Sequence, residues 1–164
     1  MKRFSTLFAV VAIAGCASVT RSPAPGPADL ATARAEITPQ LAEMLAAANA
    51  HDTDRHLAYY VRSPDLLFVV NDETIRGFDS LRVRQLGWWL NGKSDVVYGL
   101  VADPIYAMPV PGTVVQTYAL SSRRSGPDGA ARAGRINVTA IWQKRPDGWR
   151  IVYAQEAAGA ASAR

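Results

Sequence analysis

A β-hairpin near the end of the chain constrains the fold of this 164-residue sequence more than any other feature. Residues 134–157 read GRINVTAIWQKRPDGWRIVYAQEA, in which two runs rich in Ile, Val, Trp and Tyr flank a turn. In this turn Pro146 presets φ, Asp147 suits the next position and Gly148 accepts a positive φ. The sequence therefore predicts two antiparallel strands joined at residues 145–148.

The pairing of these two strands has two alternatives. A three-residue loop with a glycine bulge pairs Arg145 with Trp149, whereas a plain four-residue turn pairs Lys144 with Trp149, and the one-residue difference exchanges the faces. We expect the bulge. Side chains alternate along a strand, so the second strand has two predicted faces: Trp149, Ile151, Tyr153 and Gln155 on one, and Arg150, Val152, Ala154 and Glu156 on the other.

Length and charge favour an ordinary single globular domain. The chain has 49% hydrophobic and 20% charged residues, and its formal net charge is +4. Two of the basic residues lie at positions 2 and 3, so the rest of the chain is close to neutral. The other basic residues are scattered, and we therefore expect no nucleic-acid binding.

The first fifteen residues have the layout of a secretory signal peptide: a basic start, a short apolar run and then small residues. The sequence IAGC at 13–16 resembles the bacterial lipobox, in which the cysteine receives the lipid. Cys16 is the only cysteine, and a lone free thiol is a liability in an oxidising compartment. By resemblance to bacterial lipoproteins, Ala17 favours the outer membrane. We expect a cell-envelope lipoprotein, anchored in the outer membrane at Cys16 and facing the periplasm.

The rest of the chain divides into a tether, a domain and a tail. Residues 16–34 hold three prolines and no hydrophobic periodicity, which predicts an extended tether after the lipidated cysteine. Residues 35–157 form the domain, and residues 158–164 a disordered tail. Periodicity predicts helices over residues 35–50, 53–61 and 79–90, and strands over 66–70, 74–76, 95–108, 113–123, 134–144 and 148–156. This order predicts an α+β fold with three helices packed on one face of a mainly antiparallel sheet.

Several short motifs, taken in this order, are similar to those of a known superfamily. They are NAHDTD at 49–54, the pair Tyr59 and Tyr60, IRG at 75–77 before a helix, and GWRIV at 148–152. The chain resembles the nuclear transport factor 2-like superfamily, in particular its SnoaL-like bacterial domains, over about residues 36–157. The resemblance implies a cone-shaped fold in which a strongly curved sheet and three helices enclose a pocket, commonly as a homodimer.

The resemblance also bears on chemistry, because the superfamily includes ketosteroid isomerase and polyketide cyclases. It places the isomerase's general base at Phe68, its oxyanion tyrosine at Met44 and a frequent histidine at Gln155. None of these side chains can perform the corresponding proton chemistry. We therefore expect no ketosteroid-isomerase-type catalysis, and we assign no catalytic residue and no cofactor.

A metal site is not expected either. His51 and His56 are five residues apart and do not share a helix face well. We interpret them as a loop histidine and a solvated helix histidine rather than as metal ligands.

Aromatic residues recur on nearly every predicted element. Most of them pack the core, but tryptophan and tyrosine walls with polar tips such as Gln155 and Gln116 are what an apolar small-molecule site requires. The candidate ligand-binding residues are Tyr60, Phe68, Trp88, Trp89, Tyr118 and Gln155.

The leading hypothesis is an envelope-anchored lipoprotein with a small apolar pocket and a binding or accessory role. The alternative is a lyase- or isomerase-type enzyme, which a buried cavity carboxylate or tyrosine without a charge partner would favour. Tyr60 and Tyr118 are the candidates for that group. A third hypothesis is a protein-interaction module that uses the outer sheet face, which would then carry an exposed apolar patch.

We also expect a homodimer. The last two strands carry apolar residues on both faces, and helices can cover only one of them. The other face therefore requires a partner sheet.

Overall fold

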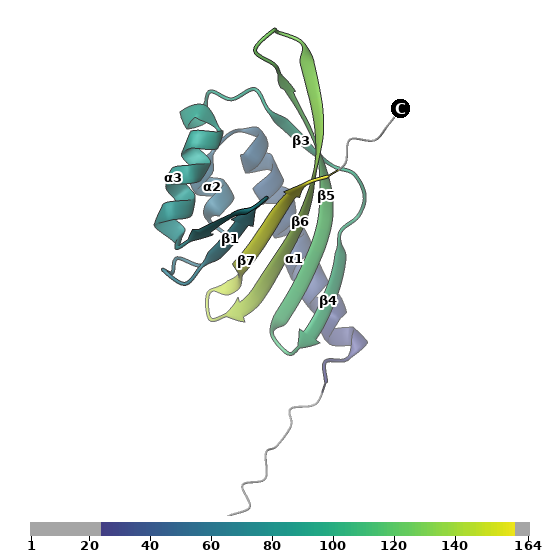
Figure 1. Ribbon diagram of the computed structural model, residues 1–164. Coiled ribbons are helices and arrows are strands. Elements are labelled where there is room, and N and C mark those ends of the chain that lie inside the picture. Colours follow the sequence, from purple (N-terminus) through teal and green to yellow (C-terminus); the bar gives the residue numbers. More distant parts are fainter. Residues whose placement is uncertain (1–23, 160–164) are drawn as a thin grey trace, which may run out of the picture.

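The computed structural model describes residues 24–159 as three helices packed on one curved, open sheet (Figure 1). The elements are α1 (Pro27–Asn49), α2 (Thr53–Leu57), β1 (Leu67–Val70), β2 (Glu73–Arg76), α3 (Phe78–Trp88), the short 3-10 helix η1 (Leu90–Gly92), β3 (Val97–Leu100), β4 (Ile105–Val110), β5 (Thr113–Ser125), β6 (Ala131–Arg145) and β7 (Gly148–Ala158). The strand order is β2-β1-β7-β6-β5-β3, and β4 also pairs with β5. The pair of β1 and β7 is parallel and the other pairs are antiparallel. The α+β fold expected from the sequence is confirmed.

Helix α1 begins eight residues before the predicted start. Pro27 occupies the first turn, where a missing N–H costs no hydrogen bond, and the Gly26 N–H donates to Asp29 Oδ2 at 2.8 Å. Ala33 is buried against the core in this added part of the helix. Residues 27–34 of the expected tether are therefore helical. The predicted signal peptide, Cys16, the first part of the tether and most of the tail lie outside the described residues.

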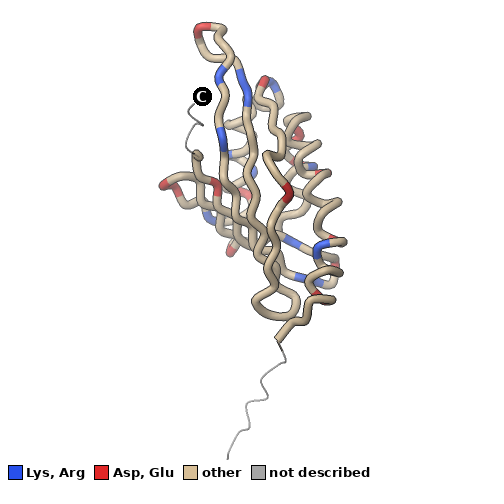
Figure 2. Tube along the Cα trace, turned by 90° about the vertical axis from the view of Figure 1, so that its right-hand side faces the viewer, with Lys and Arg blue, Asp and Glu red and all other residues tan. Residues whose placement is uncertain are grey.

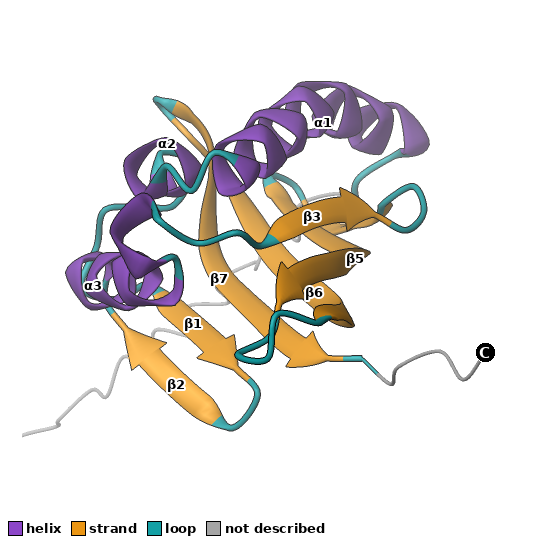
Figure 3. Cartoon of the chain, turned by 90° about the horizontal axis from the view of Figure 1, so that it is seen from above, coloured by secondary structure: helices purple, strands orange, loops and turns teal. Residues whose placement is uncertain are grey.

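Helices α2 and α3 cover the same face of the sheet as α1 (Figure 3). Asp52 caps α2 by accepting the Arg55 N–H at 3.1 Å. Arg82 of α3 donates to both carboxylate oxygens of Asp54, at 2.7 and 3.0 Å, and this ties the two helices together. Within residues 24–159 no helix has the length and apolar character that crossing a membrane requires.

The turn between β6 and β7 is the plain four-residue alternative. Lys144 pairs with Trp149 and Arg145 with Gly148, so the glycine bulge that we expected at this turn is wrong. Gly148 has φ of +105° at the last turn position, where glycine is favoured.

A bulge does occur in this hairpin, but further along β7. Trp142 pairs with Ile151 and the next residue, Ile141, pairs with Tyr153, so Val152 is the extra residue. A bulge of this kind reverses the alternation of side chains beyond it. Ala154 and Glu156 therefore face the helices, while Tyr153 and Gln155 face outward. The strict alternation that we predicted for β7 is wrong beyond Val152.

The core lies between the helices and the inner face of the sheet. Its largest fully buried side chains include Trp142, Phe68 and Ile37. Gln116 is also fully buried: it accepts a hydrogen bond from Trp142 Nε1 at 2.9 Å, and its Nε2 donates to the Tyr106 hydroxyl at 3.0 Å. The expectation that Gln116 is a polar tip of the pocket is therefore wrong, because this amide satisfies core groups.

The outer face of the sheet is not covered by a helix (Figure 3). The four-residue turn, which pairs Lys144 with Trp149 and Trp142 with Ile151, places Trp142, Trp149 and Ile151 together on the inner face. This removes the competition between faces from which we inferred a partner sheet. Val115 and Ile141, with other half-buried side chains, remain on the outer face. The homodimer stays a prediction, and sedimentation of the domain as a monomer at tens of micromolar would contradict it.

Candidate functional site

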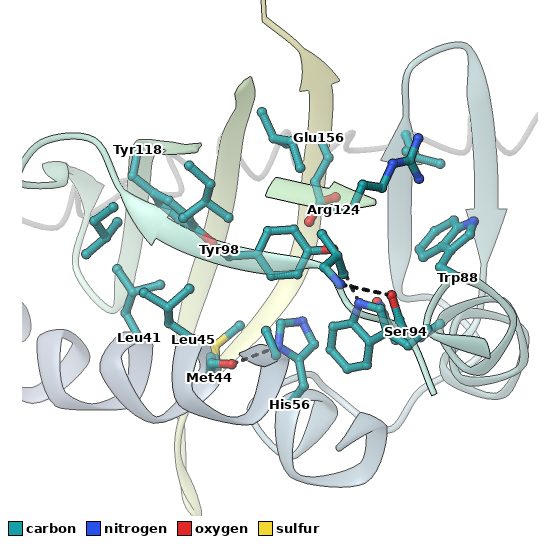
Figure 4. A pocket seen from close by; sticks show the side chains of 18 of the residues that line it. Leu41, Met44, Leu45, His56, Trp88, Ser94, Tyr98, Tyr118, Arg124 and Glu156 are labelled. Carbon is teal, nitrogen blue, oxygen red and sulfur yellow. Dashed lines mark hydrogen bonds between the residues drawn. The ribbon is translucent and has the colours of Figure 1, made fainter. Parts of the chain in front are cut away.

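A cavity of about 340 Å³ lies between the helices and the inner face of the sheet (Figure 4). Its wall is mostly aliphatic and aromatic and draws on all three helices, the β3 region and the inner face of the sheet. The lining residues are Leu41, Met44, Leu45, Ala48, His56, Tyr60, Val70, Gln85, Trp88, Trp89, Ser94, Val96, Tyr98, Leu100, Tyr118, Leu120, Arg124, Ile136 and Glu156.

Among the described residues, Glu156 is the only carboxylate on the cavity wall. It stands near the end of β7, and the bulge at Val152 turns it inward. Within residues 24–159 its carboxylate makes no hydrogen bond and no ion pair. Desolvation in this apolar wall raises the pKa of Glu156 from its ordinary value of 4.5 to about 7. The group can therefore both accept and give up a proton near neutral pH.

Three tyrosines share the cavity with Glu156. Burial, followed by the nearby negative charge of Glu156, raises the pKa of Tyr118 well above the ordinary range. Burial also raises the pKa of Tyr60 and, to a smaller extent, that of Tyr98. The Tyr98 hydroxyl accepts a hydrogen bond from Trp89 Nε1 at 3.3 Å. All three hydroxyls therefore stay protonated and can donate hydrogen bonds to a bound molecule.

His56 lies on the opposite side of the cavity from Glu156 (Figure 4). Its Nδ1 is 3.1 Å from the Met44 carbonyl oxygen, which can only accept, so Nδ1 carries the proton. Burial lowers the pKa of His56, which keeps the ring neutral and makes Nε2 an acceptor. The prediction of a solvated helix histidine is therefore wrong. His51 is bound to the Val96 carbonyl through Nε2 at 2.8 Å, and residues 24–159 contain no cluster of metal-ligating side chains.

Gln85 adds an uncharged polar group to the wall. Gln85 is buried, with only 6% of its surface exposed. Within residues 24–159 its amide makes no hydrogen bond. It is not among the fully enclosed unpaired polar atoms, which are Gln40 Oε1 and Thr53 Oγ1, so the amide is open to the cavity. A ligand in the cavity could pair with both the oxygen and the nitrogen of this amide.

Four of the six side chains predicted to bind a ligand, Tyr60, Trp88, Trp89 and Tyr118, lie on the cavity wall. The structure does not place Phe68 and Gln155 there. Phe68 is 1% exposed and packs in the core, with its ring centroid 6.4 Å from that of Tyr60 and 5.9 Å from that of Trp88.

Gln155 is exposed on the outer face of the sheet. It accepts a hydrogen bond from the Tyr153 hydroxyl at 3.2 Å. The expectation that Gln155 is a polar tip of the pocket is therefore wrong, and the cause is the Val152 bulge.

The comparisons with known proteins concern the fold. No protein-family model matches the sequence, and no curated protein is significantly similar to it. Among solved structures, the chain is similar to a nuclear transport factor 2-like superfamily protein from Salmonella enterica serovar Typhimurium, with a TM-score of 0.70, 21% identity, and coverage of 81% of this chain and 95% of that one. The chain has the nuclear transport factor 2-like fold.

Two further structures with this fold extend the comparison. An uncharacterised protein with a cystatin-like fold from Caulobacter vibrioides has a TM-score of 0.66, 18% identity and coverage of 78% and 90%. A putative dehydratase of the nuclear transport factor 2-like family from Streptomyces avermitilis has a TM-score of 0.67, 14% identity and coverage of 80% and 99%. At these identities the similarity establishes the architecture alone.

Within this fold, the positions that the resemblance assigned to ketosteroid isomerase chemistry supply no titratable group to the cavity. Phe68 lies in the core, Met44 offers a thioether to the wall, and Gln155 faces away. Apart from Arg124, the titratable side chains on the cavity wall are Glu156, His56 and the three tyrosines.

Proposed function

We propose that the cavity binds a small, largely apolar molecule and transfers a proton to or from it, with Glu156 as the general acid and base. The observation that carries this proposal is the position of the Glu156 carboxylate in an apolar wall without a cationic partner. A carboxylate with a purely structural role at this position would destabilise the fold without making a stabilising contact. A proton-transfer group, in contrast, is most effective when its pKa is near the working pH.

The other polar groups of the wall fit the same chemistry. Removal of a proton next to a carbonyl places negative charge on the carbonyl oxygen, and protonated tyrosines stabilise such charge by hydrogen bonding. Within residues 24–159 the hydroxyls of Tyr118 and Tyr60 make no hydrogen bond, so they are free to do this. Neutral His56 offers an acceptor nitrogen on the opposite wall. This set suits a lyase or an isomerase, and the putative dehydratase with the same fold is compatible with that class.

The proposal predicts exchange of acidic C–H protons in a small apolar ketone. We expect the protein to accelerate deuterium incorporation at C1 of 2-tetralone in D₂O, followed by NMR. Glu156→Gln should reduce this rate about a hundredfold or more, because a positioned general base contributes at least that much. Glu43→Gln, an exposed carboxylate on α1, is the control and should leave the rate unchanged.

Two results would contradict parts of the proposal. Equal exchange by wild type and Glu156→Gln would remove Glu156 from the chemistry. If the wild type binds 2-tetralone but does not accelerate its deuterium exchange, the result would favour a binding or accessory role, which is the leading hypothesis from the sequence.

We further propose that the protein is an outer-membrane lipoprotein, with the domain held at the periplasmic face through Cys16. The sequence IAGC at 13–16 supports this proposal. Cys16→Ser should move the protein from the membrane fraction to the soluble fraction while its fold is retained. Mass spectrometry of the mature protein that finds an unmodified Cys16, or cleavage at another position, would contradict the anchor.

A further inference from the structure

In the part of the chain that the structure describes, Arg124 is the only permanently charged cation on the cavity wall. It belongs to the outer part of β5, and its side chain is exposed. An exposed residue on the lining marks a place where the cavity opens, so the cavity has a mouth at Arg124. Within residues 24–159 Arg124 makes no ion pair and no hydrogen bond, and in particular none with Glu156. Asp95 lies close to Arg124, and its carboxylate accepts the Ser125 N–H at 2.8 Å.

The surroundings of the mouth nevertheless carry an excess of arginines. Beyond the body of the sheet, the ends of β5 and β6 form a protruding two-stranded arm with arginines along both strands (Figure 2). Arg132 is paired with Asp128 at 3.2 Å, whereas Arg123 and Arg135 have no ion-pair partner within residues 24–159. An excess of one charge at the entrance of an apolar cleft raises the local concentration of ligands of the opposite charge.

We infer that the molecule bound in the cavity carries an anionic group, such as a carboxylate, which Arg124 holds at the mouth while the apolar part lies inside. This inference rests on the proposed function and adds the substrate class. An arginine fork is well suited to a carboxylate, since it can donate two parallel hydrogen bonds. The reacting carbon would then lie deeper, on the side of Glu156, where the wall is desolvated.

A matched pair of probes tests the inference with the full folded domain. 2-Naphthoate and 2-naphthamide have nearly the same shape and apolar area, but only the first is charged. Isothermal titration calorimetry at low salt should show that the wild type binds 2-naphthoate about tenfold more tightly than 2-naphthamide, as expected for a charge-assisted hydrogen bond. High salt should reduce the preference.

Arg124→Gln should abolish the preference by weakening 2-naphthoate binding about tenfold, with little effect on 2-naphthamide. Arg123→Gln is the control, because Arg123 is the neighbouring residue on the opposite face of β5 and is not on the cavity wall. It should retain most of the preference.

The outcomes separate the two proposals. If the wild type binds both probes equally, or if Arg124→Gln keeps the preference, the anionic substrate class is wrong while the small-molecule site stands. If neither probe binds the wild type, the small-molecule site itself is contradicted, and this inference is overturned with it.

Discussion

Replacing Glu156 by glutamine is expected to stabilise the folded domain at pH 8 and to leave its stability nearly unchanged at pH 4. The pKa of Glu156 is about 7 in the folded protein and near 4.5 in the unfolded chain. Between these values the folded state binds more protons than the unfolded state, so the contribution of Glu156 becomes less favourable as pH rises through this window. Above pH 7 the cost is complete, and glutamine removes up to about 3 kcal/mol of it.

Urea denaturation of wild type and variant at pH 4, 6 and 8 measures this effect. The difference in the free energy of unfolding should grow with pH and level off above about pH 7. Other carboxylates, such as Glu36 and Asp54, whose pKa values are lowered by hydrogen bonds to cationic or indole groups, contribute equally to both proteins and cancel in the difference. Glu43→Gln should show no such rise. A Glu156→Gln variant that is less stable than the wild type at pH 8 would mean that the carboxylate is well solvated or paired.

Phe68→Ala is expected to destabilise the domain by about 3–5 kcal/mol, the usual cost of removing a fully buried phenylalanine. Phe68 is 1% exposed and its ring lies between those of Tyr60 and Trp88, so truncation leaves a void in the core. Thermal or urea unfolding measures the loss. A loss below about 1 kcal/mol would contradict this packing.

A milder pair of variants separates the core from the cavity wall. Phe68→Leu keeps an apolar side chain in the core and should leave the affinity for 2-naphthamide close to that of the wild type. Trp88→Leu removes a large aromatic surface from the wall and should lower this affinity severalfold. If Phe68→Leu lowered the affinity for 2-naphthamide more than Trp88→Leu, Phe68 would belong to the binding site, as the sequence predicted.

Most of the fold could be predicted from the sequence. Helical spacing in the first half and the strand pattern around Pro146 and Gly148 predicted most elements and their order, but the single strand expected over 95–108 is divided into β3 and β4, and α2 ends at Leu57 rather than at Val61. The start of α1 was missed because the prolines of the preceding segment indicated a tether, although Pro27 is well tolerated in the first turn of a helix.

The candidate site depended on details that periodicity does not encode. Trp88 and Tyr118 reach the wall from the inner faces of α3 and β5, and Tyr60 and Trp89 from the segments that directly follow α2 and α3.

Glu156 was missed because one extra residue, Val152, reverses the two faces of β7, and nothing in the local sequence distinguishes Val152 from its neighbours. The one residue that hints at the bulge is Ala154. Strict alternation exposes Ala154, which the bulge buries beside Ala140 of the neighbouring strand.

The most direct test of the account is the titration of Glu156 itself. In the ¹³C-labelled domain the side-chain carboxyl resonance that disappears in Glu156→Gln can be followed by NMR from pH 3 to pH 9. We expect a midpoint near pH 7, because the carboxylate lies desolvated in the cavity. A midpoint near the ordinary value of 4.5 would show that water or a cation reaches the group, and would contradict its role as the proton-transfer residue.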